Sequence, residues 1–384
     1  HRDLHSFPTR RSSDLEMIKA RDLFSKFMKE RANTGRIYLQ NVDHCNTHGA
    51  FDAKLAPIKQ SNLCMEITLP TKPLYDVQDE NGEVALCTLS AVNLGTLDSL
   101  DELEDITEII VRSLDSLLDY QDYPLKAAEL TSKNRRTLGI GVTNLAYYLA
   151  KNNAKYSDGS GNELIHKTFE ALQFYSLKAS NKLANDFGAC PLFSETQYAK
   201  GILPVDSYKK DIDEFCDTKL DLDWDSLRKD IKATGLRNST LTALMPCESS
   251  SQISNSTNGI EPPRGFVSIK QSKDGILKQV VPDYEKLHKK YELLWDIKDN
   301  EGYLQLCAIM QKFVDQSIST NTHYDPSQFE GSKVPMKLFL MDLLKAYKYG
   351  IKTLYYHTTR DGSSDDQNNN KSTDDDCEDG VCKL

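Results

Sequence analysis

The stretch SNLCMEITLPTKP, residues 61–73, places a thiol among polar groups. Within it, Asn62, Cys64 and Glu66 occupy alternating positions. In an extended strand, alternate side chains point to one face, so the carboxamide, the thiol and the carboxylate would converge on one spot. The pattern therefore predicts a reaction centre around Cys64.

The same alternation would turn Leu63 and Met65 to the opposite face, where they would pack against the protein. A simpler alternative is that Cys64 is a buried cysteine in an edge strand, because unpaired cysteine is among the most buried residue types. The pentapeptide alone leaves both interpretations open.

Size and composition bound the class of protein. The chain has 384 residues, 39% of them hydrophobic and 27% charged, with a formal net charge of −10. This profile predicts a globular protein without affinity for membranes or nucleic acid. The nine cysteines are odd in number and widely spaced, with no CxxC pair. They argue against a disulfide scaffold and a metal site, and favour a cytoplasmic location.

The first fifteen residues, HRDLHSFPTRRSSDL, have no initiator Met and no helical or strand period. They resemble a translated adapter sequence, so we exclude residues 1–15 from the fold expectations as a non-native leader. We expect native sequence to begin near Glu16 and the chain to be a C-terminal fragment of a longer protein.

Hydrophobic periodicity predicts an alternation of helices and strands. Helices are expected over 16–32, 100–120, 162–187, 300–318 and 336–349. Strands are expected over 36–42, 84–94, 240–245 and 351–356. Gly188 and Gly350 follow two of the helices and are expected to stop them. This order favours an α/β architecture with parallel strands.

Two other cysteines lie in stretches with clear local patterns. Cys87 belongs to the apolar run 84–94, which suits a fully buried strand. Cys45 lies between two histidines in the polar stretch 43–48. The spacing fits no standard metal site, so a polar loop is expected there.

A hydroxyl-rich turn follows the predicted strand 240–245. It contains Glu248, Ser249, Ser250 and Ser251, with a helix start behind them. Backbone N–H groups at a helix start, together with serine hydroxyls, predict an anion-binding loop. The alternative is a serine-rich helix cap without a ligand.

The composition changes after residue 360. Residues 361–384 are rich in Asp, Asn and Ser and are expected to remain a flexible acidic tail. Near the end lie Cys377 and Cys382. Two thiols on a mobile tether suit a redox dithiol carrier, and incidental exposed cysteines are the alternative.

Several long motifs occur in an order that resembles one family. They are NLCMEITLPTKP, ALCTLSAVNLG, LMPCESSSQISNSTNGIEPPRG, the LYY of KTLYYHTTRDG, and CEDGVCKL. From about residue 16 to the C-terminus, the chain resembles the large, catalytic subunit of aerobic class I ribonucleotide reductases. The resemblance implies a ten-stranded α/β barrel of two five-stranded halves around a finger loop. Residues 16–360 would form the later part of this barrel.

The resemblance also implies roles for the central residues. Cys64, at the tip of the finger loop, would become a thiyl radical and take the 3′ hydrogen of a ribonucleoside diphosphate. Glu66 would act as base on the 3′ hydroxyl, and Asn62 would bind the ribose hydroxyls. Cys87 would be one of two thiols that reduce the 2′ position. Its partner thiol would lie upstream, outside this sequence.

Further roles follow from the same resemblance. Tyr355 and Tyr356 match a pair of radical-relay tyrosines. The relay would begin at a tyrosyl radical in a separate, metal-containing small subunit, so this chain itself would bind no metal. Cys377 and Cys382 would re-reduce the active-site disulfide and be regenerated by thioredoxin or glutaredoxin. The full-length protein would be a homodimer that binds ATP and deoxynucleoside triphosphates as effectors.

The residues that match the family's diphosphate loop are Glu248, Ser249, Ser250 and Ser251. Cys247 departs from the family pattern, because a Ser or Thr is usual there. We expect this departure to weaken one hydroxyl contact at most.

Two rival interpretations remain. An anaerobic or cobalamin-dependent reductase could use the same barrel, but the pair Tyr355 and Tyr356 argues against both, and no glycyl-radical motif is visible near the C-terminus. The second rival is a truncated, inactive chain that only binds nucleotide or the small subunit.

Overall fold

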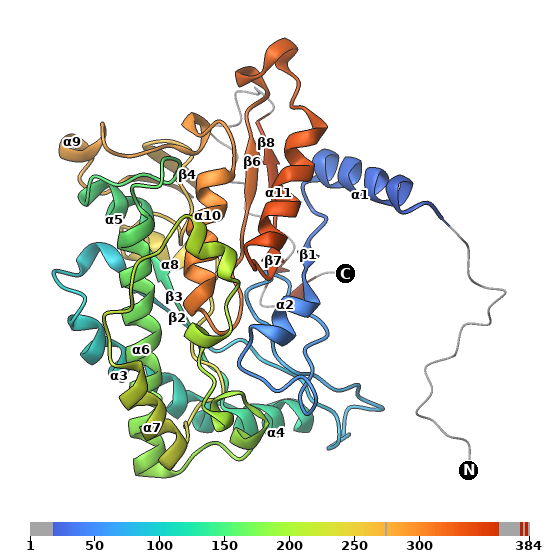
Figure 1. The fold of residues 1–384 in the computed structure, drawn as a ribbon, viewed down its shortest axis with the longest axis vertical. Helices are drawn as coiled ribbons and strands as arrows, with labels where there is room; N and C mark the ends of the chain where they lie inside the picture. The colour runs from blue at the N-terminus through green and yellow to red at the C-terminus, as the bar shows by residue number, and fades with distance from the viewer. Residues whose placement is uncertain (1–17, 273–274, 361–376, 379–380, 383–384) are drawn as a thin grey trace.

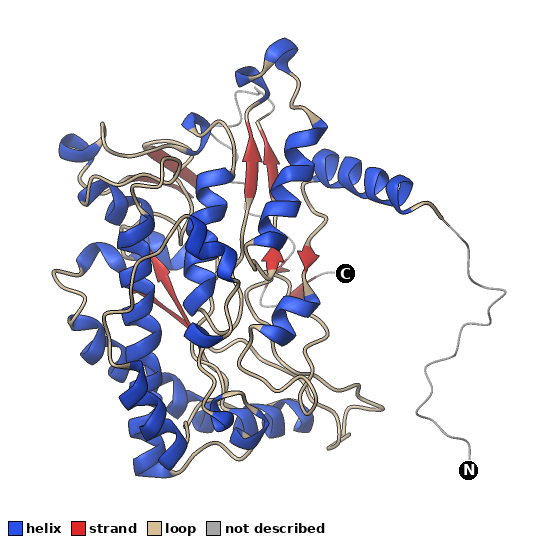
Figure 2. Ribbon diagram, in the orientation of Figure 1, coloured by secondary structure: helices blue, strands red, loops and turns tan. Residues whose placement is uncertain are grey.

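The computed structural model describes residues 18–272, 275–360, 377–378 and 381–382. The helices are α1 (Ala20–Thr34), α2 (Val42–Thr47), α3 (Glu102–Tyr120), α4 (Lys126–Arg135), α5 (Leu145–Lys151), α6 (Asn162–Phe187), α7 (Trp224–Thr234), α8 (Glu248–Ile253), α9 (Tyr284–Leu287), α10 (Glu301–Phe313) and α11 (Met336–Lys348). The strands are β1 (Leu39–Gln40), β2 (Leu89–Asn93), β3 (Gly139–Thr143), β4 (Val267–Ser272), β5 (Gly275–Val280), β6 (Thr322–Tyr324), β7 (Thr353–Leu354), β8 (His357–Thr359), β9 (Cys377–Glu378) and β10 (Val381–Cys382). Short strands lie between longer helices (Figure 2).

Successive segments form a run of mostly parallel pairings. β2 pairs in parallel with β3, and a parallel bridge from Ile140 to Thr242 adds the segment 240–245. A second parallel bridge joins Leu244 to Ile318, after which the chain enters β6, the parallel partner of β8. β1 pairs antiparallel with β7. The fold is therefore mixed α/β with parallel strands, as expected, but the described residues do not form one closed barrel.

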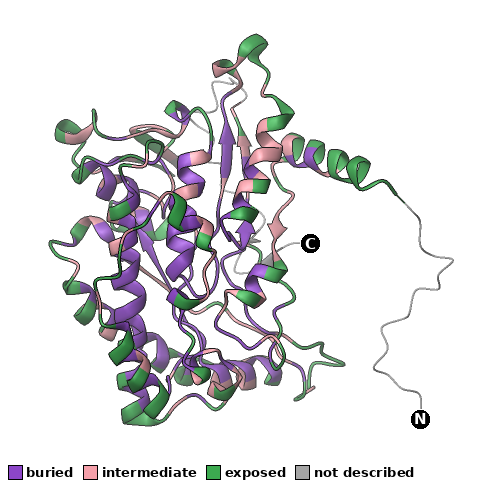
Figure 3. Cartoon of the chain, viewed as in Figure 1, coloured by how far each residue is buried: buried purple, intermediate pink, exposed green. Residues whose placement is uncertain are grey.

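The long helices form as their apolar patterns predict. In α3, Leu103 and Leu118 are buried while Ile109 is exposed, so the helix is amphipathic. α6 is buried along most of its length and packs against α3, α7 and α10 (Figure 3). It ends before Gly188, whose φ of 85° suits glycine. The predicted helices over 100–120 and 162–187 are confirmed.

Close packing explains the glycines of β3. A Cβ at Gly139 would lie 2.6 Å from the side chain of Leu89, and one at Gly141 would lie 2.7 Å from the carbonyl oxygen of Ala243. β3 therefore fits between β2 and the segment 240–245 only because it lacks these side chains.

Several predicted strands are shorter than expected. The predicted strand 36–42 is reduced to β1, that over 351–356 to β7, and that over 240–245 to isolated bridges. The predicted polar loop 43–48 is wrong, because most of it forms α2. His44 is buried there and stacks on Tyr347 of α11 at 4.4 Å between ring centroids. Tertiary packing thus makes a helix from a stretch that composition assigned to a loop.

The first helix is correctly predicted, but most of the apolar residues that predicted it are not buried. α1 extends away from the body of the molecule (Figure 1). Ile18, Leu23 and Phe24 are exposed, whereas Met28 and Arg31 are buried near its C-terminal end. Periodicity identified the helix without revealing which of its residues contact the rest of the chain.

The predicted leader, residues 1–15, lies outside the described residues, as does most of the predicted flexible tail. In the described part of the tail, the backbones of Cys377 and Cys382 pair across β9 and β10. No helix in the described ranges has both the length and the hydrophobicity that crossing a bilayer requires. Nor do three or more His, Cys, Asp or Glu side chains gather there as a metal site would require.

Candidate active site

Cys64 lies in a tight turn, not in a strand. Met65 has a φ of 72°, in the left-handed region, and its N–H donates to the carbonyl of Asn62 at 3.2 Å. The prediction of an extended strand with alternating side chains is therefore wrong for this stretch. Met65 is buried as predicted, but Leu63 is exposed. The turn presents Leu63 to solvent because the chain reverses there instead of continuing as a strand.

The turn nevertheless brings the polar groups together. The Asn62 Nδ2 donates to Glu66 Oε1 at 2.9 Å and to Cys87 Sγ at 3.7 Å. The Oδ1 of Asn62 accepts from the backbone N–H of Ile67 at 3.1 Å. The carboxamide is thus fixed at both ends and links the carboxylate to the second thiol.

Glu66 is a buried carboxyl held by the chain beside it. It is 2% exposed, and its backbone carbonyl accepts from the N–H of Ser317 at 2.9 Å. Ser319 Oγ donates to Glu66 Oε2 at 3.3 Å and also to the carbonyl of Cys64. Burial raises the pKa of Glu66, and the hydrogen bonds from Asn62 and Ser319 oppose this rise. The site holds a carboxyl that is easier to protonate than usual.

Cys87 does not lie in a buried strand, so that prediction is wrong. The residue is exposed and precedes β2, which begins only at Leu89. Although the residue as a whole is exposed, neighbouring atoms desolvate its thiol. This desolvation, with the negative charges of Glu66 and Cys64, raises the pKa of Cys87 to about 11. Cys87 is therefore a neutral thiol at neutral pH, suited to donate hydrogen and not to act as a thiolate.

The rings of the two adjacent tyrosines lie against each other and reach the half-buried Cys64. The ring centroids of Tyr355 and Tyr356 are 4.2 Å apart, with an angle of 59° between the planes. Burial raises the pKa of Tyr355, and its charge interaction and side-chain hydrogen bond with Cys64 raise it further. Phenol and thiol are thus in direct contact.

A third phenol, absent from the sequence analysis, completes this cluster. The ring of Tyr38 lies 4.6 Å from that of Tyr355 and 5.0 Å from that of Tyr356. Burial raises the pKa of Tyr38, and the hydrogen bond with Tyr356 adds to the rise. Tyr38 is brought to this cluster by the pairing of β1 with β7, which places Leu39 opposite Leu354. That pairing is a tertiary fact and cannot be read from local spacing.

The serine-rich segment begins α8. Glu248, Ser249 and Ser250 are exposed at its start, whereas Ser251 is buried and its Oγ donates to the carbonyl of Glu248 at 3.1 Å. Cys247 is also buried. The first three residues face solvent and can meet a ligand, and the last two point into the protein.

The loop after α8 is connected to the segment between β7 and β8 that carries Tyr355 and Tyr356. Asn321 donates to the carboxylate of Glu261, and its Oδ1 accepts from the N–H of Tyr356 at 2.9 Å. Burial raises the pKa of Glu261 to about 7, opposed by Arg264 and supported by the charge of Glu248. Glu261 lies in the motif LMPCESSSQISNSTNGIEPPRG, and nothing in its spacing predicts the contact with Asn321.

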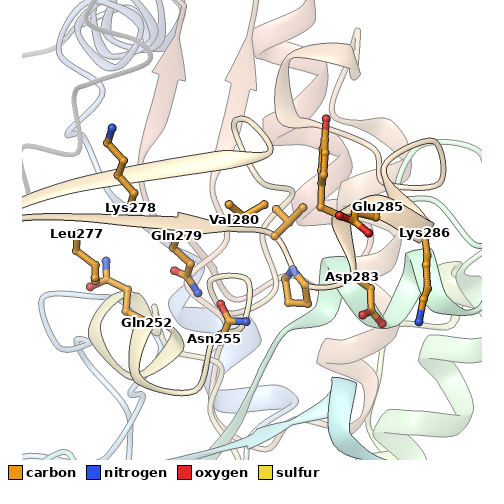
Figure 4. A pocket seen from close by; sticks show the side chains of 12 residues that line it. Gln252, Asn255, Leu277, Lys278, Gln279, Val280, Asp283, Glu285 and Lys286 are labelled. Atoms are coloured by element: carbon orange, nitrogen blue, oxygen red, sulfur yellow. The ribbon is translucent and has the colours of Figure 1, made fainter.

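A cleft of about 700 Å³ lies beside α8 and β5 (Figure 4). Gln252, Asn255 and residues 277–286 line it, so it is not the space around Cys64. The Gln279 Nε2 donates to the carbonyl oxygens of Ser251 and Ser256 at 3.3 and 3.0 Å. Gln279 on β5, which lines the cleft, therefore also holds the backbone of the serine-rich segment in place.

Comparison with known proteins agrees with this geometry. The model of the family described as ribonucleotide reductase, barrel domain, matches residues 8–357. The chain belongs to this ribonucleotide reductase family. The alpha subunit of the ribonucleoside-diphosphate reductase of Haemophilus influenzae is 66% identical over 367 residues, which cover 96% of this chain and 48% of that protein.

Two other relatives show the same coverage. The alpha subunit of ribonucleoside-diphosphate reductase 1 of Escherichia coli is 66% identical over 96% of this chain and 49% of its own length. That of Enterobacteria phage T4 is 50% identical over 90% of this chain and 46% of its own length. The chain thus spans about half the length of these ribonucleotide reductase subunits, and the predicted resemblance to the class I large subunit is confirmed.

Proposed function

We propose that this chain carries the reaction centre of a class I ribonucleoside-diphosphate reductase alpha subunit. The protein would convert ribonucleoside diphosphates to 2′-deoxyribonucleoside diphosphates for DNA precursor synthesis. The observation that carries the proposal is the contact of the Cys64 thiol with Tyr355, at a turn that also holds Asn62, Glu66 and Cys87.

The proposed reaction begins at the phenols. A metal-containing partner subunit with a tyrosyl radical would supply the oxidising equivalent. Tyr356 and Tyr355 would pass it to Cys64, whose thiol loses one electron and one proton. The thiyl radical then takes the 3′ hydrogen atom of the ribose. Glu66 takes the proton of the 3′ hydroxyl, and Asn62 holds the ribose hydroxyls in place.

The second part of the reaction is a two-electron reduction. The 2′ hydroxyl leaves as water, and Cys87 with a second thiol supplies two electrons and two protons and becomes a disulfide. Cys64 then returns its hydrogen atom to the 3′ carbon, and Glu66 returns the proton to the 3′ oxygen. The second thiol would come from the part of the subunit that this chain does not span. Cys377 and Cys382 would restore the dithiol by exchange and be regenerated by thioredoxin or glutaredoxin.

The finer features of the fold belong to the same proposal. The parallel run from β2 through β3 and β6 to β8 suits one half of a ten-stranded barrel, with residues 16–360 contributing this half. The Cys64 turn would be the finger loop, because segment 317–319 of the run holds it. We propose a cytoplasmic homodimer that binds nucleoside triphosphate effectors outside this chain.

The decisive experiment uses the complete alpha subunit with its small subunit, a ribonucleoside diphosphate and thioredoxin. We expect one deoxyribonucleoside diphosphate for each disulfide formed. The 384-residue chain alone is the matched control and should give no product, because the second thiol is missing. A complete subunit that binds diphosphate but forms no product would favour the alternative of a chain that only binds nucleotide or its partner.

The buried carboxyl of Glu66 gives the reaction a pH dependence. Its pKa is raised above the ordinary 4.5, and only the carboxylate can accept a proton. The rate should therefore rise with pH through this raised pKa. Glu66→Gln should lower kcat/KM by about 10²- to 10⁴-fold, the range for loss of a general base. The test is a pH profile of kcat/KM for both proteins. If Glu66→Gln keeps the kcat/KM of the unchanged protein and the same fall in kcat/KM at low pH, Glu66 is not the base.

Cys247 should be dispensable for diphosphate binding. Its Sγ donates to the carbonyl oxygens of Val142 and Met245, both at 3.6 Å, so it points away from the exposed helix start. Cys247→Ser should change the Kd by no more than about twofold, or ~0.4 kcal/mol. Ser249→Ala is the contrast and should weaken binding about tenfold, the effect of one charge-assisted hydrogen bond. Equilibrium dialysis measures both, and a large loss in Cys247→Ser would contradict the prediction.

A further inference from the structure

One buried guanidinium lies behind the three clustered phenols. Arg31 is in the last turn of α1 and is 3% exposed, although much of this helix faces solvent. Its Nη1 donates to the carbonyl oxygens of Ile37 and Tyr355, the latter at 2.9 Å. Its Nη2 donates to the carbonyl oxygen of Tyr356 at 3.4 Å. The planar fork of one side chain thus contacts two separate segments of the backbone.

These carbonyls all lie beside the phenols. Ile37 immediately precedes Tyr38, and the other two carbonyls belong to Tyr355 and Tyr356 themselves. The three rings are 4.2 to 5.0 Å apart between centroids. A single cation therefore fixes the relative position of all three ring-bearing residues.

The end of α1 is built to reach this place. Gly35 ends the helix with a φ of 71°, and its carbonyl accepts from the N–H of His357 at 3.0 Å. A Cβ at Gly35 would lie 2.5 Å from the carbonyl oxygen of His357. Only glycine allows this approach, which brings Arg31 against the strand that follows the tyrosines.

The charge of Arg31 is retained and balanced. Burial lowers the pKa of its guanidinium to about 10, and the carboxylate of Asp342 on α11 opposes this shift. Asp342 itself accepts hydrogen bonds from Tyr324 and Asn300, both at 2.8 Å. At neutral pH the cation is present and its counter-charge is held in place.

We propose that Arg31 is a positioning residue for radical transfer, which sets the spacing of Tyr38, Tyr355 and Tyr356 through their backbone. The proposal rests on the proposed function. Displacements of about 1 Å at a reacting group can cost about 10²-fold in rate. The hydrogen bonds of Arg31 go to backbone carbonyl oxygens, so it acts through the residues that it holds.

The competing explanation is that Arg31 only anchors α1. In that case its replacement would lower stability without changing transfer between the rings. The two roles are separated by an oxidisable tyrosine analogue, 3-aminotyrosine, placed at position 355 of the complete subunit. A radical from the small subunit must then pass Tyr356 before the analogue traps it, and electron paramagnetic resonance measures its yield.

Arg31→Lys keeps the positive charge but loses the planar guanidinium group, whose terminal nitrogens donate to two separate backbone segments. With the small subunit and a ribonucleoside diphosphate present, we expect the trapped radical to form at least tenfold more slowly than with Arg31, while the Kd for the diphosphate stays within twofold. Arg136→Lys is the matched control. Arg136 is equally buried, but its side chain donates to Asp115 and Asp119. Its replacement should leave trapping within twofold, measured below the melting temperature of both variants.

A rescue experiment tests the same role with a larger deletion. A small cavity between α1 and α11 adjoins the Arg31 side chain, bordered also by Met28, Phe339 and Asp342. In Arg31→Ala, millimolar guanidinium should enter the enlarged cavity and restore trapping at least threefold, whereas methylammonium should not. Should Arg31→Ala not fold, Arg31→Lys decides alone.

The outcomes separate the two proposals. If the trapped radical forms at the same rate in Arg31→Lys as in the protein with Arg31, the positioning role is overturned. Equal losses in Arg31→Lys and Arg136→Lys also overturn it, because the effect is then one of stability. If the protein with Arg31 traps no radical, or Tyr356→Phe traps as much, the proposed function fails instead.

Discussion

Replacing Cys64 by serine in the complete subunit is expected to abolish the reduction of ribonucleoside diphosphates while leaving their binding unchanged. The turn at Met65 and the hydrogen bond from Ser319 to the Cys64 carbonyl hold the residue by its backbone, so a serine would occupy the same place. Its O–H bond is stronger than the S–H bond, and a phenoxyl radical at Tyr355 cannot break it. The expected loss is about 10⁴-fold or more, as when the reacting atom of a catalytic set is removed.

Product formation and equilibrium dialysis with the diphosphate measure the two effects separately. Cys45→Ser is the matched control, because Cys45 is a free thiol buried in α2. It should keep its turnover. Retained turnover in Cys64→Ser would reject the assignment of the thiyl radical to this residue.

The second large effect is expected at Tyr356. Tyr356→Phe keeps the ring that packs against Tyr355 and Tyr38 and removes only the hydroxyl. Stability should fall by no more than about 1 kcal/mol, the usual net value of one hydrogen bond. Turnover should be lost, because phenylalanine has no O–H that can pass a proton and an electron.

Turnover with the small subunit and a thermal melt test this prediction together. Tyr347→Phe is the control, since Tyr347 is a phenol on α11 whose hydroxyl contacts Asp43. It should lose a comparable amount of stability and keep its activity. Normal turnover of Tyr356→Phe would reject the relay.

The helices could be predicted because their signals are local. The apolar repeat of α3 and the glycine after α6 are enough to place both elements. The repeat of α1 is equally clear, yet Leu23 is exposed and Arg31 is buried. A hydrophobic repeat shows that one face of a helix is apolar. Only the tertiary structure shows what that face contacts.

The site could be predicted in part, and for a partly wrong reason. Alternation suggested that Asn62, Cys64 and Glu66 share one face, but a left-handed Met65 brings them together. Their proposed chemical roles came from the resemblance of whole motifs. Tyr38 could not be found from local pattern, because its neighbours come from the far end of the sequence.

The hydrogen bond between Arg31 and Tyr355 joins residues 324 positions apart. Contacts of such separation form late in folding, since a long loop must close first. During synthesis, Tyr38 and Cys64 are therefore made long before Tyr355 and Tyr356 can pack beside them. In the proposed reaction, a growing chain that stops short of Tyr355 would hold the Cys64 thiol without the two phenols that would oxidise it.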